Sequence, residues 1–349
     1  MTTMMRAAVL YSRDDVRIEM RAIPEIGDGE ILVRTRASGI CSGDTMSWYV
    51  ERKAPLVLGH EPAGEIVAIG NGGARDAQGV ELRIGDRVAP HHHAPCFDCA
   101  HCARGEFVAC ATWRKTRLDP GGLAEYFRVP VANLRDTLQV SDGMSFEDAS
   151  LVEPLACVMK SLRRSGLHAG DLLYVIGLGV MGQLHVLAAR ALGARIVASD
   201  FLAPRRALAE TNGAVVAHPE QALAIVREAS QRDGAEVTIC GPGTPLALEH
   251  ALATTASGGC VVMFTPLEPE AQFLLAHSDF YFRDLRLIAS YSCGPHDTLA
   301  AHTLLLSGTV SAQKVGATQY CLDDVAAAYA DLRAANVIKP IITFPVPSP

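Results

Sequence analysis

The chain has 349 residues, which is more than one hydrophobic core usually serves, so its length predicts two domains. Apolar residues make up 49% of the sequence and charged residues 20%, as in ordinary globular proteins. The 31 basic and 38 acidic residues leave a net charge of −7, which excludes a basic surface for nucleic acid or for an anionic membrane.

Neither export nor membrane insertion is expected from the sequence. The segment 1–6 lacks the long apolar core of a signal peptide. The most apolar stretch, 172–192, is interrupted by glycines and polar side chains and is unsuited to crossing a bilayer. Ten cysteines in a chain without an export signal favour metal or redox chemistry over disulfides, so we expect a cytoplasmic protein.

Short β-leaning runs with glycine between them fill the first 150 residues. Examples are residues 6–11, 30–37, 64–69 and 86–89. Long helical periods are few in this part of the chain, which predicts an irregular, β-rich domain.

A dispersed set of candidate metal ligands consists of Cys41, the pair His60-Glu61 and, further along the chain, Glu153. A single His-Glu pair in a loop is more often structural than catalytic. Sulfur, nitrogen and oxygen ligands from separate loops would nevertheless hold zinc with one position open for a substrate oxygen. The spacing leaves open whether these residues converge.

A compact cysteine motif follows. Four thiolates within 15 residues can close a tetrahedral shell around zinc, which predicts a structural site that stabilises an irregular loop. A ferredoxin-type cluster would have its fourth cysteine closer and followed by proline, whereas Ala111 follows here. The acidic balance disfavours a zinc ribbon for nucleic acid. The four cysteines are Cys96, Cys99, Cys102 and Cys110, and the alternative ligands nearby are His91, His92, His93 and His101.

Five further cysteines are scattered among apolar neighbours. Residues of this kind behave as small hydrophobic side chains, so we expect inert buried thiols. They are Cys157, Cys240, Cys260, Cys293 and Cys321.

The pattern changes near Ser145, where residues 145–165 have helical spacing. Apolar runs then alternate with Ala-rich segments of helical period, which predicts an α/β fold with a doubly wound parallel sheet. The predicted strands are 172–176, 195–199, 215–217, 237–240 and 261–264. Further along, 285–292 and 338–344 read as strands, and 297–307 and 323–335 as helices.

The first of these strands leads into a glycine-rich turn, Gly177-x-Gly179-x-x-Gly182, that opens a helix. In such a turn the glycines allow a tight bend and a close approach of a pyrophosphate to the helix N-terminus. A turn that binds nothing is the alternative. Asp200, 18 residues after Gly182 at the end of the second strand, favours dinucleotide binding.

Together these motifs resemble the medium-chain, zinc-containing alcohol dehydrogenases, and within them the sorbitol (polyol) and threonine dehydrogenase branch. The matching segments occur in the family's order and span nearly the whole chain. They are 39–44, 59–64 with Gly70, 85–88, 96–110, 121–126, 153–156 and 177–182.

The resemblance implies a β-rich, GroES-like catalytic domain formed by residues 1–156 and 293–349. A Rossmann domain, residues 157–292, would be inserted between them. The family also implies a homodimer or homotetramer joined through the edges of the Rossmann sheets, for which the predicted strand 285–292 is our candidate.

A catalytic zinc held by Cys41, His60 and Glu61 is implied as well. Glu153 would be a fourth ligand or the partner of the zinc-bound water, and an acidic residue there is similar to the polyol branch. Asp44 resembles the carboxylate that orients the ligand histidine.

One position departs from the family pattern. Members usually carry serine or threonine two residues after the zinc cysteine, where it relays the alcohol proton, but this chain has Gly43. Either Ser42 takes over the relay, or Thr45, Glu153 or water does. A plain loop hydroxyl is the alternative role for Ser42.

For the cofactor, the resemblance implies NAD. Asp200 would accept hydrogen bonds from the adenosine ribose, and Arg205 would pack along the adenine, with Arg206 a solvated helix residue. The other cofactor-binding residues implied are Gly177, Gly179, Met181, Gly182, Thr265 and Ser292.

The function that follows is a zinc-dependent, reversible hydride transfer between NAD and a small secondary alcohol or polyol. Two zinc ions per chain, one catalytic and one structural, belong to this hypothesis. The alternatives are a dehydrogenase of an amino alcohol or of a cyclic polyol in a biosynthetic pathway, and a catalytically idle NAD-binding protein. Nothing in the sequence fixes the direction of the reaction.

Overall fold

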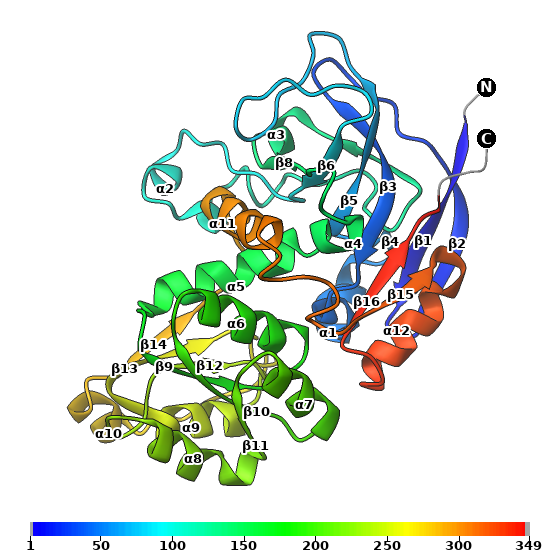
Figure 1. Cartoon of the computed structure of the whole chain (residues 1–349). Helices are drawn as coiled ribbons and strands as arrows, with labels where there is room; N and C mark the ends of the chain where they lie inside the picture. Colours follow the sequence, from blue (N-terminus) through cyan, green and yellow to red (C-terminus); the bar gives the residue numbers. More distant parts are fainter. Residues whose placement is uncertain (1–2, 346–349) are drawn as a thin grey trace. The chain divides into compact units, whose positions relative to one another are not determined.

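The computed structural model describes residues 3–345 (Figure 1). The chain forms two compact units, one made of residues 1–156 and 293–349 and the other of residues 157–292. We call them the discontinuous unit and the central unit.

A seven-stranded sheet lies at the centre of the discontinuous unit. Six strands follow the order β15-β16-β3-β5-β6-β8, and β7 pairs with β3. β3 is antiparallel to both β16 and β5. The strands are β3 (Ile31–Gly39), β5 (Glu61–Ile69), β6 (Arg87–Pro90), β7 (Tyr126–Val129), β8 (Thr137–Gln139), β15 (Ala317–Cys321) and β16 (Lys339–Thr343).

A smaller sheet of order β2-β1-β4 completes the strands of this unit, with β1 (Met4–Ser12), β2 (Asp15–Ala22) and β4 (Leu56–Val57). Alternate side chains of β3 are buried, as expected for a strand with one face on a core. Ile31 and Val33 pack with Phe127 in one apolar cluster, and Leu10, Ile40 and Ile342 belong to a second one.

The helices of the discontinuous unit are mostly short. They are α1 (Ser47–Val50), α2 (Ala100–Ala103), α3 (Val131–Leu134), α4 (Phe146–Ala149), α11 (Pro295–Leu306) and α12 (Val325–Arg333), with the 3₁₀ turns η1 (Ser42–Thr45), η2 (Glu51–Lys53), η3 (Phe107–Ala109) and η5 (Leu322–Asp324). The longer α5 (Val152–Ser165) begins in this unit and ends in the central one.

The central unit is a six-stranded parallel sheet of order β11-β10-β9-β12-β13-β14. All five residues of β9 are buried, because helices cover both faces of such a sheet (Figure 1). The strands are β9 (Leu172–Ile176), β10 (Arg195–Ser199), β11 (Val215–Ala217), β12 (Ala235–Cys240), β13 (Thr255–Met263) and β14 (Arg286–Ala289). The helices are α6 (Val180–Ala191), α7 (Ala203–Thr211), α8 (Ala222–Ala229), α9 (Pro245–Thr254) and α10 (His277–Phe282), with the 3₁₀ turn η4 (Pro219–Gln221).

The predicted fold class, a doubly wound parallel sheet beside a β-rich domain, is confirmed. One element differs from prediction, because residues 145–165 form two helices rather than one. Pro154 has no amide hydrogen to donate to the Ser150 carbonyl four residues earlier, so a continuous helix would lose that bond, and a new helix begins at Val152. No helix within residues 3–345 is both long and apolar enough to cross a membrane.

Candidate active site

Three of the predicted metal ligands meet at one end of the β3–β5 pair. In the antiparallel register Gly39 faces Glu61, so Cys41, just after β3, and His60, just before Glu61, emerge at the same end. The sulfur of Cys41, a ring nitrogen of His60 and a carboxylate oxygen of Glu61 all lie within 4.8 Å of one another. The structure thus brings these three residues together.

Gly59 sets the path of the chain into His60. Its φ is +99°, a conformation that side chains rarely adopt. A Cβ here would lie 2.3 Å from the Leu123 amide nitrogen. Only glycine fits, and the backbone conformation that it allows directs His60 toward Cys41.

Asp44 lies beside His60 as predicted, with its Oδ2 3.6 Å from the histidine Nδ1. The carboxylate is buried, with a residue exposure of 5%. Burial by itself lowers the pKa of His60, but the Asp44 carboxylate and the Cys41 thiolate outweigh burial and raise that pKa well above its usual value. The geometry suits a carboxylate that orients a ligand histidine.

Lys339, which the sequence analysis did not single out, contacts one of the candidate metal ligands. Its ammonium group, fully buried on β16, pairs with Glu61 Oε2 and donates to the Ile40 carbonyl at 3.1 Å. Glu61 Oε1 is buried without a hydrogen-bond partner among residues 3–345. One oxygen of this carboxylate is therefore held by lysine, and the other is left for a further ligand. A lysine within the apolar run 338–344 was the available signal.

Glu153 is placed differently from the other three residues. Its carboxylate gathers with His91 and His92, all ligand atoms within 4.8 Å, rather than with the cluster of Cys41, His60 and Glu61. It remains close enough to His60 to raise the pKa of that histidine. The structure thus places Glu153 at the margin of the site.

The proton-relay candidates lie on η1, directly after Cys41. The amide of Gly43 donates to the Cys41 sulfur at 3.4 Å, and the Thr45 hydroxyl donates to the Ser42 carbonyl at 2.7 Å. Thr45 is thereby committed to a backbone bond, whereas Ser42 stands next to Cys41, the candidate metal ligand. A Cβ on Gly43 would lie 3.4 Å from the Cys41 sulfur.

The four cysteines of the compact motif come together as a cluster. Their sulfurs are separated by 3.8 Å (Cys96 to Cys102), 3.5 Å (Cys99 to Cys102) and 3.6 Å (Cys96 to Cys110). Ligands about 2.3 Å from a tetrahedral zinc are about 3.8 Å apart, so the cluster has the size of a zinc site. No histidine belongs to it, and His101 instead pairs with Glu106 at 3.0 Å.

The loop that carries the four cysteines has only a small apolar core. Its apolar cluster consists of Cys102, Phe107, Cys110 and Trp113, with a few half-buried neighbours. Trp113 is 2% exposed, and its ring centre lies 4.1 Å from that of His93. A core this small depends on a cross-link for its stability.

The glycine-rich turn of the central unit has the geometry of a phosphate-binding loop. Gly177 has φ +87°, and a Cβ on Gly182 would lie 2.0 Å from the Gly177 carbonyl oxygen, so both positions require glycine. Gly179 is the N-cap of α6, which directs the free amides of that helix outward from the turn.

Asp200 supports this turn directly. It is 8% exposed, and its Oδ2 accepts from the Leu178 amide at 2.7 Å while Oδ1 accepts from the Leu202 amide at 2.8 Å. Arg205 lies 3.7 Å from the same carboxylate. Arg206 donates to the carbonyls of Asp200 and Phe201, so it is a backbone clamp rather than a solvated residue.

The remaining predicted cofactor residues follow the carboxyl ends of strands in the same sheet. Met181 is in the first turn of α6, Thr265 follows β13, and Ser292 follows β14. Ser292 has φ +52°, and its buried hydroxyl has no hydrogen-bond partner within the described residues. Carboxyl ends of parallel strands are where dinucleotides bind in such sheets.

The scattered cysteines follow the prediction only in part. Cys240, Cys260 and Cys293 are buried and Cys157 is half-buried, but Cys321 is exposed and its thiol donates to Asp324 Oδ2 at 2.8 Å. The prediction of a buried thiol was wrong for Cys321 because it lies at the end of the edge strand β15, where one side of the sheet is open. None of the ten cysteines, all within residues 3–345, is in a disulfide.

Comparisons with known proteins identify the family of the chain. Residues 27–139 match the family model of the alcohol dehydrogenase GroES-like domain, and residues 180–307 match that of the zinc-binding dehydrogenase. The chain is 31% identical to a sorbitol dehydrogenase of Bombyx mori over 302 residues, covering 82% of this chain and 83% of that protein. It is 30% identical to a sorbitol dehydrogenase of Bacillus subtilis over 268 residues, 73% of each chain.

Solved structures give the same picture. A structure described as a zinc-binding dehydrogenase from Sinorhizobium meliloti bound to NADP has a TM-score of 0.85 at 26% identity, covering 98% of this chain and 100% of that one. The 2R,3R-butanediol dehydrogenase from Bacillus subtilis has a TM-score of 0.83 at 26% identity, with the same coverage.

The fold and the comparisons together show that this protein is an oxidoreductase that acts on alcohols. The chain belongs to the zinc-binding alcohol dehydrogenase family, in its sorbitol dehydrogenase-like branch. The predicted GroES-like and Rossmann folds, the dependence on zinc and the reaction class are confirmed.

Proposed function

We propose that this chain oxidises a secondary hydroxyl of a small polyol to a ketone, reversibly, with NAD and a zinc ion held by Cys41, His60 and Glu61. The observation that carries the proposal is the Oε1 of Glu61, which is buried beside a thiol and an imidazole and has no hydrogen-bond partner among the residues that the structure describes. A thiolate, an imidazole and a carboxylate are a ligand set for catalytic zinc, with a fourth position left for a substrate oxygen.

Each part of the site has a separate role in this reaction. Zinc at this site would supply a Lewis acid that lowers the pKa of a bound hydroxyl. Asp44 holds His60 in place, and Lys339 restricts Glu61 to binding through one oxygen. In the central unit, the turn at Gly177 and the N-terminus of α6 would hold the pyrophosphate of the cofactor. The hydride transfer itself is chemistry of the nicotinamide.

A substrate screen tests the proposal. Polyols such as sorbitol, xylitol and butanediol, simple alcohols and amino alcohols are offered with NAD, and absorbance of the reduced cofactor is followed. We expect turnover with polyols, since similar proteins are named for sorbitol and butanediol. Turnover confined to amino alcohols would favour that alternative, and no turnover with any alcohol by zinc-loaded protein would favour an idle NAD-binding protein.

We expect NAD to be preferred over NADP. NADP carries a phosphate in place of the ribose 2′-hydroxyl of NAD. Near Asp200 this phosphate could not donate the hydrogen bonds that the hydroxyl donates, and its negative charge would be repelled by the carboxylate. Charge-assisted bonds worth about 1.5–3 kcal/mol correspond to a preference of roughly ten- to hundredfold. Measurement of kcat/KM with each cofactor should show it, and Asp200→Ser should move the preference toward NADP.

Because Asp200 also accepts bonds from two amides of the turn, the thermal stability of Asp200→Ser is measured alongside. Glu210→Ser, an exposed carboxylate on α7, is the matched control and should change neither property. A wild type that prefers NADP, as the bound cofactor of the Sinorhizobium meliloti structure allows, would overturn the role of Asp200.

Ser42 is expected to relay the alcohol proton. Ser42→Ala should then slow turnover by about tenfold to thousandfold, the range for a lost proton-transfer group, and change the pH–rate profile. Adding Gly43→Ser to this variant should restore turnover, since a side chain on residue 43 would lie beside the Cys41 sulfur. An unchanged pH–rate profile in Ser42→Ala would show that Ser42 is a loop hydroxyl only.

We also propose a dimer or tetramer joined through β14. This strand is the edge of the central sheet, and it is preceded by Tyr281 and Phe282, which are 68% and 81% exposed. Light scattering at micromolar concentration should show at least a dimer, and Phe282→Glu should weaken it. Leu246→Glu, equally exposed but on α9, should leave the oligomer intact, and a stable wild-type monomer would contradict the proposal.

Finally, we propose the cytoplasm as the site of action. The support is the set of ten cysteines without a disulfide, four of them clustered, which suits a reducing compartment.

A further inference from the structure

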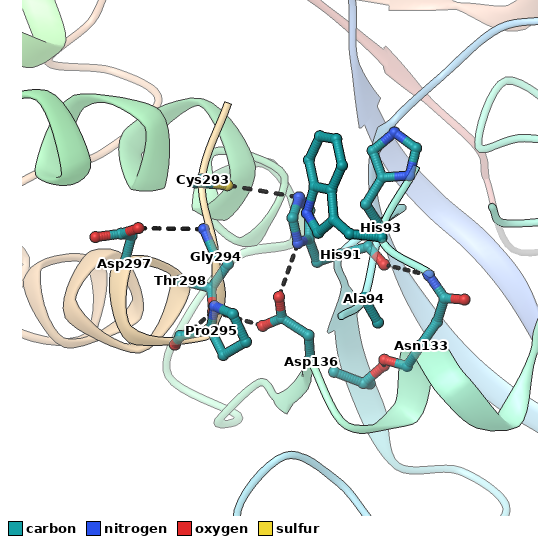
Figure 2. A network of polar contacts seen from close by, with 12 residues as sticks. His91, His93, Ala94, Asn133, Asp136, Cys293, Gly294, Pro295, Asp297 and Thr298 are labelled. Atoms are coloured by element: carbon teal, nitrogen blue, oxygen red, sulfur yellow. Dashed lines mark hydrogen bonds and ion pairs between the residues drawn. The ribbon is translucent and has the colours of Figure 1, made fainter. Parts of the chain in front are cut away.

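His91 is held in a fixed orientation by a buried carboxylate. It follows β6 directly, is 2% exposed, and its Nδ1 lies 2.8 Å from Asp136 Oδ2 (Figure 2). The other oxygen of Asp136 accepts from the Thr298 hydroxyl at 2.6 Å. When Nδ1–H donates to a carboxylate in this way, Nε2 is the free lone pair. Metal-bound histidines are oriented by the same arrangement.

The Nε2 of His91 faces a second potential ligand, the sulfur of Cys293, at 3.5 Å (Figure 2). A nitrogen about 2.0 Å and a sulfur about 2.3 Å from the same tetrahedral zinc lie about 3.5 Å apart. A hydrogen bond between thiol and imidazole also fits this separation. The groups around the pair decide between the two readings.

Two further donors surround this pair. The ligand atoms of His91, His92 and Glu153 lie within 4.8 Å of one another, and so do those of Glu153 and Cys293. The Nδ1 of His92 is buried without a hydrogen-bond partner in the described part of the chain. Glu153 and His91 also line one small cavity, together with Glu61. A hydrogen bond between His91 and Cys293 alone would explain neither the buried Nδ1 of His92, unpartnered among the described residues, nor the cavity beside His91 and Glu153.

We propose that His91, His92, Glu153 and Cys293 form a third metal site, distinct from the four-cysteine cluster and from the set of Cys41, His60 and Glu61. Two imidazoles, a thiolate and a carboxylate favour zinc or a similar divalent transition metal over magnesium or calcium. The ring centres of His60 and His92 are 5.0 Å apart, so the site adjoins the proposed catalytic zinc.

The test counts metal ions and does not depend on turnover. Full-length protein is saturated with zinc, freed of loosely bound metal by gel filtration, and analysed for zinc per chain. We expect about three in the wild type, and the loss of one in both His91→Asn and Cys293→Ser. The matched controls are Cys321→Ser and His168→Asn, exposed residues of the same types, which should keep the wild-type content.

Two results would overturn the third site. One is a folded His91→Asn or Cys293→Ser protein with the zinc content of the wild type. The other is a wild type that binds only two zinc ions per chain, of which Cys41→Ser removes one; this result needs no folded His91 variant. A third site that fails in this way leaves the proposed dehydrogenase chemistry untouched, since that is measured by turnover with polyols.

Discussion

Cys99→Ser is expected to give a chain that unfolds or aggregates. Structural zinc contributes on the order of 10 kcal/mol to the module that it holds, which is comparable with the roughly 5–15 kcal/mol stability of a whole domain. The apolar cluster of the cysteine loop is too small to replace it. Far-UV circular dichroism, thermal melting and the soluble yield measure the effect.

Cys321→Ser serves as the control, because Cys321 is an exposed cysteine outside the cluster. It should melt as the wild type does. If Cys99→Ser kept the wild-type melting temperature and zinc content, the four cysteines would not form a structural zinc site.

His60→Ala is expected to abolish turnover and leave a folded protein. The substitution removes one of three ligands of the proposed catalytic zinc, and metal polarisation of a hydroxyl is worth several kcal/mol in the transition state. A loss of kcat/KM of about a thousandfold or more follows. The glycine-rich turn belongs to the other unit, so binding of NAD, measured by calorimetry, should persist.

His168→Ala provides a matched histidine control, since the His168 side chain is 83% exposed. Its turnover should equal that of the wild type. A fully active His60→Ala protein would remove His60 from the catalytic site, and a loss of NAD binding together with turnover would indicate general misfolding.

The central sheet was accessible from sequence because its signals are local. Three strands, β9, β10 and β11, have the predicted bounds, since each is a short apolar run between glycines or polar residues. The cysteine motif is similarly local, with four ligands in 15 residues. In both cases the interacting residues are close in sequence, so spacing carries the information.

The contacts that sequence did not reveal join distant residues. Lys339 and Glu61 are 278 positions apart, and His91 and Cys293 are 202 apart. No periodicity links such pairs. The order of strands in the sheet brings Lys339 of β16 close to Glu61 of β5, and the segment between β14 and α11 brings Cys293 to His91. Glu153 illustrates the same limit, because its carboxylate lies with His91 and His92 rather than with Cys41, His60 and Glu61, and the spacing in the sequence does not indicate which group it joins.

The strand order of the discontinuous unit has a consequence for biosynthesis. β16 lies between β15 and β3, so β3 can pair with β5 and β7 early but gains β16 beside it only when residues 339–343 have been made. Domains form on the ribosome as their residues emerge, and the central unit is continuous in sequence whereas this one is not. Until translation nears its end, Glu61 lacks its lysine, and nascent chains therefore have no complete set of zinc ligands held in place.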